Sequence, residues 1–166
     1  MARLQRRLIE LGWLTGDADG YYGDDTAEAV RAYQYQIAQV QDGSADVTLQ
    51  QRLFADDARA NVVYTPLAQG ARGQEVLAIQ KRLIDLGYLD NTEANTDGDY
   101  GPTLAGAVQQ LKADIQQRMM ETSDERLLDI LFTASQYLDD QADPDFQNFL
   151  FSDNALMFNK NPMYPY

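Results

Sequence analysis

Residues 4–14 read LQRRLIELGWL, and residues 79–89 read IQKRLIDLGYL. Seven of these eleven aligned positions are identical, and the other four exchange similar residues. Two further blocks recur in the same order: residues 19–23 (DGYYG) match residues 97–101 (DGDYG), and residues 45–58 match residues 142–155 with seven of fourteen positions identical. Three matching blocks in one order indicate a single structural unit that the chain uses twice.

The spacing between matching blocks shows where the second copy differs. The first block repeats at an offset of 75 residues, the second at 78 and the third at 97. The second copy therefore has three more residues before its Asp-Gly pair and nineteen more between its middle and last blocks. Because insertions are tolerated best in surface connections, we expect an insertion at about residues 113–141.

Composition narrows the chemistry available to the chain. Its 166 residues include neither cysteine nor histidine, and the net charge is −13. This excludes disulfides and Ser–His or Cys–His catalytic pairs, and removes most zinc ligands. The charge disfavours nucleic acid and anionic membranes as partners, although it also serves solubility. Neither a membrane-spanning apolar run nor a signal-peptide pattern is visible.

Apolar spacing predicts three short helices in the first copy. They are expected at residues 3–12, at about 25–38, and after Asp46, which is a good N-terminal capping residue. Gly12 is placed to end the first helix.

The second copy repeats this plan and adds one helix. Its first helix is expected at about residues 74–87, and its second begins at Pro102 and continues to about Arg118. The insertion then contains an amphipathic helix at 126–138, for which Ser123 is the predicted cap. The last helix is expected at 144–151.

These patterns predict an all-α fold of two tandem three-helix bundles, the second with an inserted helix. The predicted division is a first copy at 1–58, an extended linker at 59–71, a second copy at 72–155 with its insertion at about 113–141, and an aromatic tail at 156–166.

The ordered blocks resemble a known family. L-Q-x-x-L-x-x-L-G-[YW]-L on the first helix, D-G-x-[FY]-G in the next loop and T-x-x-A-V-x-x-[FY]-Q on the second helix are typical of the peptidoglycan-binding-domain-like family. This family is a small three-helix module found beside bacterial cell-wall hydrolases. The match covers most of residues 1–112 and resumes at 142–155, and the segment Gly70-x-Arg72-Gly73-x-x-Val76 is also typical. The second copy departs from the pattern at Leu104 and at Leu111-Lys112.

The resemblance implies a non-catalytic module that binds peptidoglycan, without a cofactor, as a targeting part of a larger wall-acting protein. Its partners would be the glycan or the stem peptide and a fused or associated cell-wall hydrolase, with no nucleic acid and no membrane insertion. The implied location is the bacterial cell envelope or the outside of the cell. The alternative is a structural or protein–protein interaction module that keeps the fold without binding the wall.

Candidate ligand contacts lie in or beside the Asp-Gly loops. Tyr21 is expected to be exposed, and its ring can pack on sugar C–H surfaces while its hydroxyl forms hydrogen bonds. Tyr22 and Tyr100 are expected to point into the core. The candidates are Trp13, Asp19, Tyr21, Arg31, Gln34, Tyr88 and Asp99. The structural interpretation is core or half-buried cover for Trp13 and Tyr88, loop hydrogen bonding for Asp19, and solvation for Arg31 and Gln34.

Metal binding and catalysis have weaker support. The loops contain fragments of an EF-hand pattern, but the twelfth position is Thr26 or Leu104 instead of the bidentate glutamate. A glycosidase needs two carboxylates across a cleft, and two small helical bundles offer no obvious one. We therefore expect no metal site and no enzyme.

Overall fold

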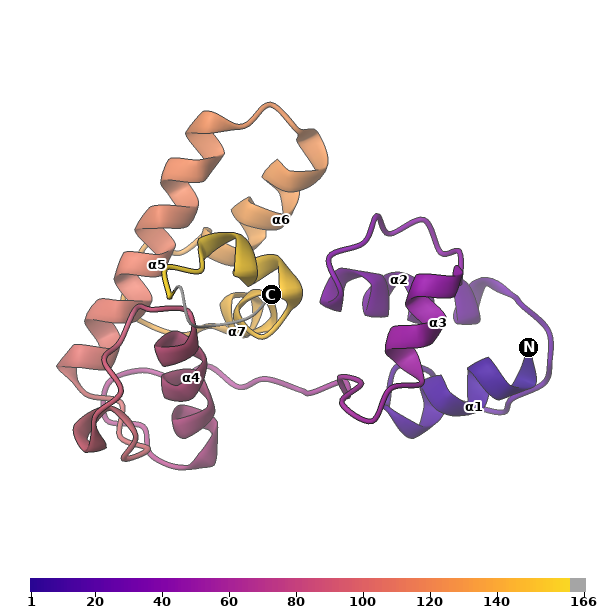
Figure 1. Cartoon of the computed structure of the whole chain (residues 1–166), viewed down its shortest axis with the longest axis horizontal. Helices are drawn as coiled ribbons and strands as arrows, with labels where there is room; N and C mark the ends of the chain where they lie inside the picture. Colours follow the sequence, from indigo (N-terminus) through magenta and orange to yellow (C-terminus); the bar gives the residue numbers. More distant parts are fainter. Residues whose placement is uncertain (162–166) are drawn as a thin grey trace. The chain divides into compact units, whose positions relative to one another are not determined.

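A computed structural model describes residues 1–161 of the chain (Figure 1). Over these residues the regular elements are helices, accompanied by two isolated antiparallel bridges. The chain divides into two compact units: unit 1 comprises Met1–Val63 with Ser152–Asn154, and unit 2 comprises Tyr64–Phe151 with the residues from Ala155 onward. The predicted all-α class is confirmed.

Unit 1 contains three helices, α1 (Ala2–Glu10), α2 (Asp24–Gln36) and α3 (Val47–Leu53) (Figure 1). The apolar stripes of these helices meet in one core, whose fully buried side chains include Leu8, Val30, Leu49 and Leu53. All three predicted helices are present, and the first two end two residues earlier than the apolar pattern suggested.

Glycine ends the first helix of both units in the same way. The Gly12 N–H donates to the Ile9 carbonyl at 3.0 Å and the Trp13 N–H to the Leu8 carbonyl at 2.8 Å. This paired pattern needs a left-handed residue after the helix, and Gly12 has φ +82°. Gly87, with φ +84°, occupies the same position after the first helix of unit 2.

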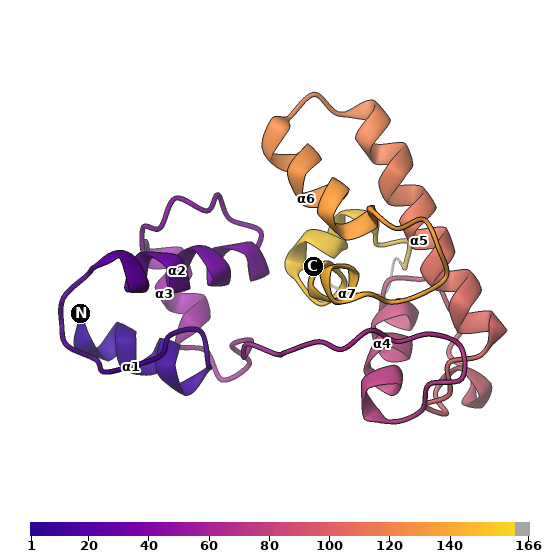
Figure 2. The same ribbon diagram turned by 180° about the vertical axis from the view of Figure 1, so that it is seen from behind.

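Unit 2 contains the matching helices and the extra one. The elements are α4 (Gln74–Asp85), the 3-10 turn η1 (Glu93–Asn95), α5 (Pro102–Glu121), α6 (Glu125–Ser135) and α7 (Pro144–Leu150), followed by the 3-10 helix η2 (Asp153–Phe158). The inserted residues extend α5 beyond the length of α2 and form α6, which packs against α5 and α7 (Figure 2).

The predicted cap of the inserted helix was wrong by one residue. Asp124, not Ser123, is the N-cap, and its Oδ1 accepts hydrogen bonds from the Arg126 N–H at 3.0 Å and the Leu127 N–H at 3.4 Å. Serine and aspartate are equally good caps. The choice therefore depends on where the backbone turns into the helix.

The last α-helix of each unit begins at an aspartate N-cap. Asp46 Oδ1 accepts the Leu49 N–H at 2.8 Å, which confirms the predicted cap of α3. Asp143 Oδ1 accepts the Phe146 N–H at 2.8 Å at the start of α7. These bonds satisfy backbone donors that the first turn of a helix leaves free.

Two further predictions concern the C-terminal residues and membranes. The helix η2 runs across the predicted start of the aromatic tail at residue 156, and residues 162–166 of that tail lie outside the described residues. Among residues 1–161, no helix combines the length and apolar character needed to cross a membrane.

Candidate functional site

A buried glutamine organises the Asp-Gly loop of unit 1. Gln5 lies on α1 and is only 2% exposed. Its Nε2 lies 3.0 Å from Asp19 Oδ1, 2.9 Å from the Tyr21 carbonyl and 3.0 Å from Thr26 Oγ1, so its two hydrogens serve three acceptors. Its Oε1 accepts the Gly20 N–H at 2.8 Å. One side chain thus joins α1, the loop and the start of α2.

Asp19 closes the same loop from the other direction. Its Oδ1 accepts the Tyr21 N–H at 2.9 Å around Gly20, which has φ +78°. The Tyr21 N–H and then the Gln5 amide hold the pKa of Asp19 below its ordinary value of 3.8. Asp19 is therefore ionised at neutral pH and presents a fixed acceptor to solvent.

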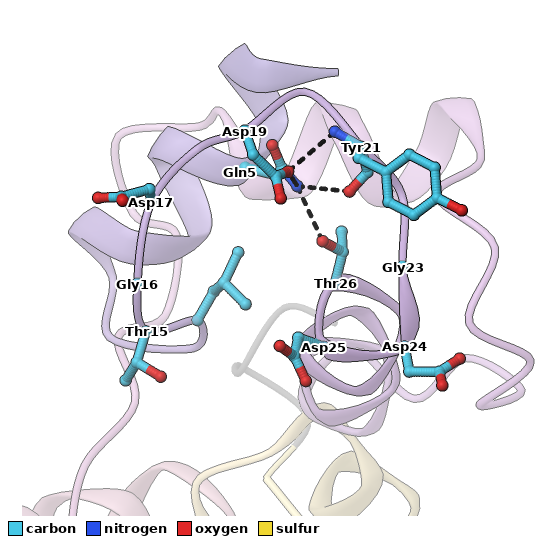
Figure 3. Close-up of a pocket in the computed structure, with 11 residues that line it drawn as sticks. Gln5, Thr15, Gly16, Asp17, Asp19, Tyr21, Gly23, Asp24, Asp25 and Thr26 are labelled. Atoms are coloured by element: carbon cyan, nitrogen blue, oxygen red, sulfur yellow. Dashed lines mark hydrogen bonds between the residues drawn. The ribbon is translucent and has the colours of Figure 1, made fainter.

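The loop and the start of α2 enclose a pocket of about 570 Å³. In Figure 3, the loop at Thr15 lies across this space from Asp25 and Thr26. The Asp17 carboxylate points away from the space, and the Tyr21 ring lies at its outer edge. Tyr21 is 75% exposed, as predicted. The polar lining consists mainly of aspartates: Asp17, Asp19, Asp24 and Asp25. Such a pocket offers hydrogen-bond acceptors beside an aromatic face.

The buried glutamine of unit 2 makes the same loop contacts as Gln5, but the exposed residue of its loop differs. Gln80 Nε2 donates to Asp97 Oδ1 at 3.1 Å, and its Oε1 accepts the Gly98 N–H at 2.9 Å. The Asp99 N–H and then the Gln80 amide lower the pKa of Asp97. Asp99 occupies the position of Tyr21 and pairs with Arg72, with 3.1 Å between Asp99 Oδ1 and Arg72 Nε. The candidate Asp99 is thus engaged by its own chain.

The segment before α4 also pairs with the loop of unit 2. The Gly73 N–H donates to the Gly98 carbonyl at 3.0 Å, and the Gly70 N–H to the Tyr100 carbonyl at 3.0 Å. The Tyr100 N–H returns a bond to the Ala71 carbonyl at 2.9 Å. This backbone pairing covers one edge of the loop in unit 2.

The family comparison agrees with this duplicated architecture. The family described as "Putative peptidoglycan binding domain" matches residues 1–53 and 72–114. The two matches span more than half of the chain and fall on the two repeats. The chain belongs to this family. No curated protein and no solved structure matches this chain.

Gln34 performs the same task as Gln5 at another turn of this peptidoglycan-binding domain. It is 2% exposed, its Nε2 donates to Asp42 Oδ1 at 2.8 Å, and its Oε1 accepts the Gly43 N–H at 3.0 Å. The Gln34 amide and then the Ser44 N–H lower the pKa of Asp42. Gln34 is therefore buried and hydrogen-bonded, whereas its structural interpretation from the sequence was a solvated surface residue. Arg31 lies against Gly43 and pairs with a glutamate of its own helix, so neither candidate lines the Tyr21 pocket.

In unit 2 a buried lysine replaces this second glutamine. The Lys112 side chain is fully buried, and its Nζ lies 2.7 Å from Asp139 Oδ1, 2.6 Å from the Gln141 carbonyl and 3.5 Å from Asp143 Oδ2. Burial alone would raise the pKa of Asp139, but the Lys112 ammonium lowers it below 3.8. Unit 2 departs from the family pattern at this position but retains the turn. A lysine ammonium holds the turn in place of a glutamine amide.

Tyr22 and Tyr100, which both face inward, make equivalent contacts with this turn in the two units. The Tyr22 hydroxyl donates to the Gly43 carbonyl, and the Tyr100 hydroxyl donates to the Asp140 carbonyl. Tyr100 is 2% exposed, and Tyr22 is partly buried against the core of unit 1. Both were predicted to point inward, and both link the Asp-Gly loop of their unit to its second turn.

Trp13 and Tyr88 are half-buried and already have partners. Trp13 Nε1 donates to the Arg59 carbonyl at 2.8 Å, and its ring contacts Tyr33 edge-on with centroids 6.0 Å apart. The Tyr88 hydroxyl donates to Asp114, and burial followed by this carboxylate raises the pKa of Tyr88 above its ordinary value. These contacts fit the cover role that was the structural alternative for both residues.

Sequence reasoning missed Gln5 and Gln80 as site-forming residues. A signal was available, because each glutamine directly follows a core position of the repeated block, Leu4 or Ile79, and lies three residues before a leucine of the same face. A polar side chain beside an apolar stripe must find partners when it is buried. Among the described residues, no cluster of three or more aspartate or glutamate side chains is arranged to hold a metal ion.

Proposed function

We propose that this chain is a non-catalytic peptidoglycan-binding module and that unit 1 binds the glycan or stem peptide at the Tyr21 pocket. The observation that carries the proposal is the exposed Tyr21 ring beside a group of aspartates, of which Asp19 is held in place by hydrogen bonds, in a chain of the peptidoglycan-binding family. Sugars suit such a site, since their C–H faces pack on aromatic rings and their hydroxyls donate to carboxylates.

The rigid loop supports this assignment. Gln5 and Asp19 fix the backbone on both sides of Tyr21, so that little loop entropy is lost when a ligand binds. Neither residue is proposed to take part in a reaction. Asp19 contributes an oriented acceptor, and Tyr21 contributes contact area.

Unit 2 is proposed to support unit 1 and not to bind at the equivalent position. Asp99 provides no aromatic face and is paired with Arg72, and the segment at residues 70–73 covers the loop edge. Two competent linked sites would raise overall avidity. One competent site gives only its own affinity, so we expect modest binding from this chain.

We further propose that the chain acts in the cell envelope or outside the cell as the targeting part of a larger wall-acting protein. The support is the family, whose modules occur beside wall hydrolases. The proposed domain limits are those of the sequence repeat, with the linker at residues 59–71.

A second candidate function is protein–protein interaction through the insertion. Phe132, Tyr137 and Leu138 in and after α6 are 56%, 57% and 64% exposed. A group of exposed apolar side chains on an element that unit 1 lacks favours a docking surface. This function would use the fold without requiring wall binding.

Co-sedimentation with purified peptidoglycan sacculi, stripped of teichoic acid, tests the first proposal. We expect Tyr21→Ala to weaken binding about fivefold, because an exposed aromatic contact contributes about 1 kcal/mol. Tyr137→Ala is the matched control, since it removes another exposed tyrosine from outside the pocket. Wild-type protein that remains folded in the supernatant would overturn the proposal and favour the interaction module.

A further inference from the structure

A second hollow on unit 1 has the opposite charge character to the Tyr21 pocket. It has a volume of about 290 Å³ and lies between α1 and the end of α3. We call it the basic groove, and its lining residues are Arg3, Arg6, Arg7, Glu10, Phe54 and Asp56. Three arginines in one groove are unusual in a chain that has only 13 basic residues against 26 acidic ones.

One of these arginines is fully engaged by the fold. Arg7 Nε donates to the Leu53 carbonyl at 2.8 Å and Nη2 to the Ala55 carbonyl at 2.9 Å. Its Nη1 pairs with Glu10 at 3.2 Å. Arg7 therefore holds the end of α3 against α1 and has little capacity left for a ligand.

The other two arginines retain free donors. The Arg3 guanidinium lies 4.5 Å from the centroid of the Phe54 ring, and Arg6 is exposed. Among residues 1–161, no ion pair joins either arginine to a carboxylate. A guanidinium stacked on a ring keeps its N–H groups in the plane, where they can bind two oxygens of a carboxylate or a phosphate in a bidentate manner.

Unit 2 shows that the fold needs neither a cation at the position of Arg3 nor a guanidinium at the position of Arg6. Ala78 replaces Arg3 and Lys81 replaces Arg6 at the offset of 75 residues. Arg82 keeps the structural role of Arg7, and its Nε donates to the Leu150 carbonyl at 2.8 Å. Phe151, which replaces Phe54, stacks on Tyr64 with centroids 5.9 Å apart. The guanidinium over the ring is thus specific to unit 1.

We infer that the basic groove binds an anionic oxygen group of the wall polymer, either a carboxylate or a phosphate. This inference rests on the proposed wall-binding function and adds a second contact to it. Arg3 and Arg6 would bind the anion, since a guanidinium and an oxyanion form short charge-assisted hydrogen bonds. Asp56 is the opposing charge in the groove, because Glu10 is already paired with Arg7. The anion could be a stem-peptide carboxylate or the phosphodiester of a polymer attached to the wall.

Binding to two preparations of sacculi tests the inference and separates the two sources. One preparation keeps its phosphate-containing polymers and the other is stripped of them. The variant combines Arg3→Ala, which copies unit 2, with Arg6→Gln, and Lys81→Gln is the matched control. We expect the double variant to lose about tenfold in affinity, with a weaker salt dependence, while the control binds like the wild type. A loss on intact sacculi alone identifies the phosphate, and an equal loss on both identifies the carboxylate.

A soluble probe gives a reading that does not depend on wall binding. Inorganic phosphate should shift the side-chain Nε–H signals of Arg3 and Arg6 in NMR spectra, and Asp56→Asn should lower the phosphate concentration needed about twofold. If the double variant binds both sacculi like the wild type while Tyr21→Ala does not, the groove assignment is wrong and the proposed function stands. If the wild type binds neither sacculus, the proposed function fails. The assignment of a wall anion to the groove then fails with it, and a phosphate-induced shift of these signals would report binding of the free anion alone.

Discussion

The turn before the last helix is held by a neutral amide in unit 1 and by a buried ammonium in unit 2. Gln34 both donates to Asp42 and accepts from Gly43. Lys112 can only donate, and it faces two carboxylates and a carbonyl. The comparison shows that these copies preserve a buried polar contact by changing its chemistry together with its partners, because a buried polar group without a partner is costly.

The Asp-Gly loops teach the complementary lesson. Their buried part is the same in both units, since Gln5 and Gln80 make matching contacts. Their exposed part differs, with a free Tyr21 in one unit and an ion-paired Asp99 in the other. A rigid scaffold has thus been kept while the residue that it presents to solvent has changed.

The largest effect is expected from removing the buried Lys112 ammonium of unit 2. Lys112→Ala leaves the Asp139 carboxylate and the Gln141 carbonyl without their buried donor, and should destabilise unit 2 by about 3 kcal/mol. Gln34→Ala, which removes the neutral amide at the matching turn, should destabilise unit 1 by about 1–2 kcal/mol. Urea unfolding followed through NMR signals of each unit measures both values. Equal losses would show that the charge of Lys112 adds nothing.

Lys112→Gln sharpens the same comparison. This variant copies the residue of unit 1 and retains a donor, so its loss of stability should lie between that of Lys112→Ala and the wild type. A loss as large as that of Lys112→Ala would mean that only an ammonium reaches the partners of this turn.

A middle-sized effect is expected from the glutamines of the two Asp-Gly loops. Gln5→Ala and Gln80→Ala should each destabilise their own unit by about 2 kcal/mol, because the N–H of Gly20 or Gly98 loses its acceptor. Only Gln5→Ala should also weaken binding to sacculi, since only unit 1 presents Tyr21. Similar losses of binding in both variants would contradict the assignment of the site to unit 1.

The smallest difference is expected between the two glycines that end the first helices. Both have positive φ, so alanine costs about 1 kcal/mol of strain at either position. A Cβ on Gly12 would meet its nearest neighbour, Asn61 Cβ, at an ordinary 3.6 Å, whereas one on Gly87 would lie 2.9 Å from the Asn161 nitrogen. Gly87→Ala should therefore cost roughly 1 kcal/mol more than Gly12→Ala. Thermal unfolding of the two variants would show this as an additional fall in the melting temperature of unit 2.

Most of the fold could be predicted from local patterns. Apolar spacing located the helices to within a few residues, and Gly12 and Asp46 marked a helix end and a helix start. The cap of α6 could not be chosen from sequence, because Ser123 and Asp124 both suit the role and only the path of the backbone separates them.

The candidate site could be predicted only in part. The exposure of Tyr21 followed from the inward orientation of Tyr22, its neighbour in an extended loop. The burial of Gln34 could not be foreseen, since a glutamine on a helix is usually solvated. Its partners lie eight to ten residues further along the chain, in a turn whose position depends on the packing of α2.

The sequence by itself determined the duplicated helical plan, the helix-ending glycines and the family, because these depend on residue types at fixed short spacings. The tertiary structure decided which polar side chains became buried clamps and which loop residue stayed open to solvent. Gln5, Gln34 and Lys112 acquire their roles only when segments 8 to 31 residues away are brought against them. A buried polar group needs partners that its own helix does not supply.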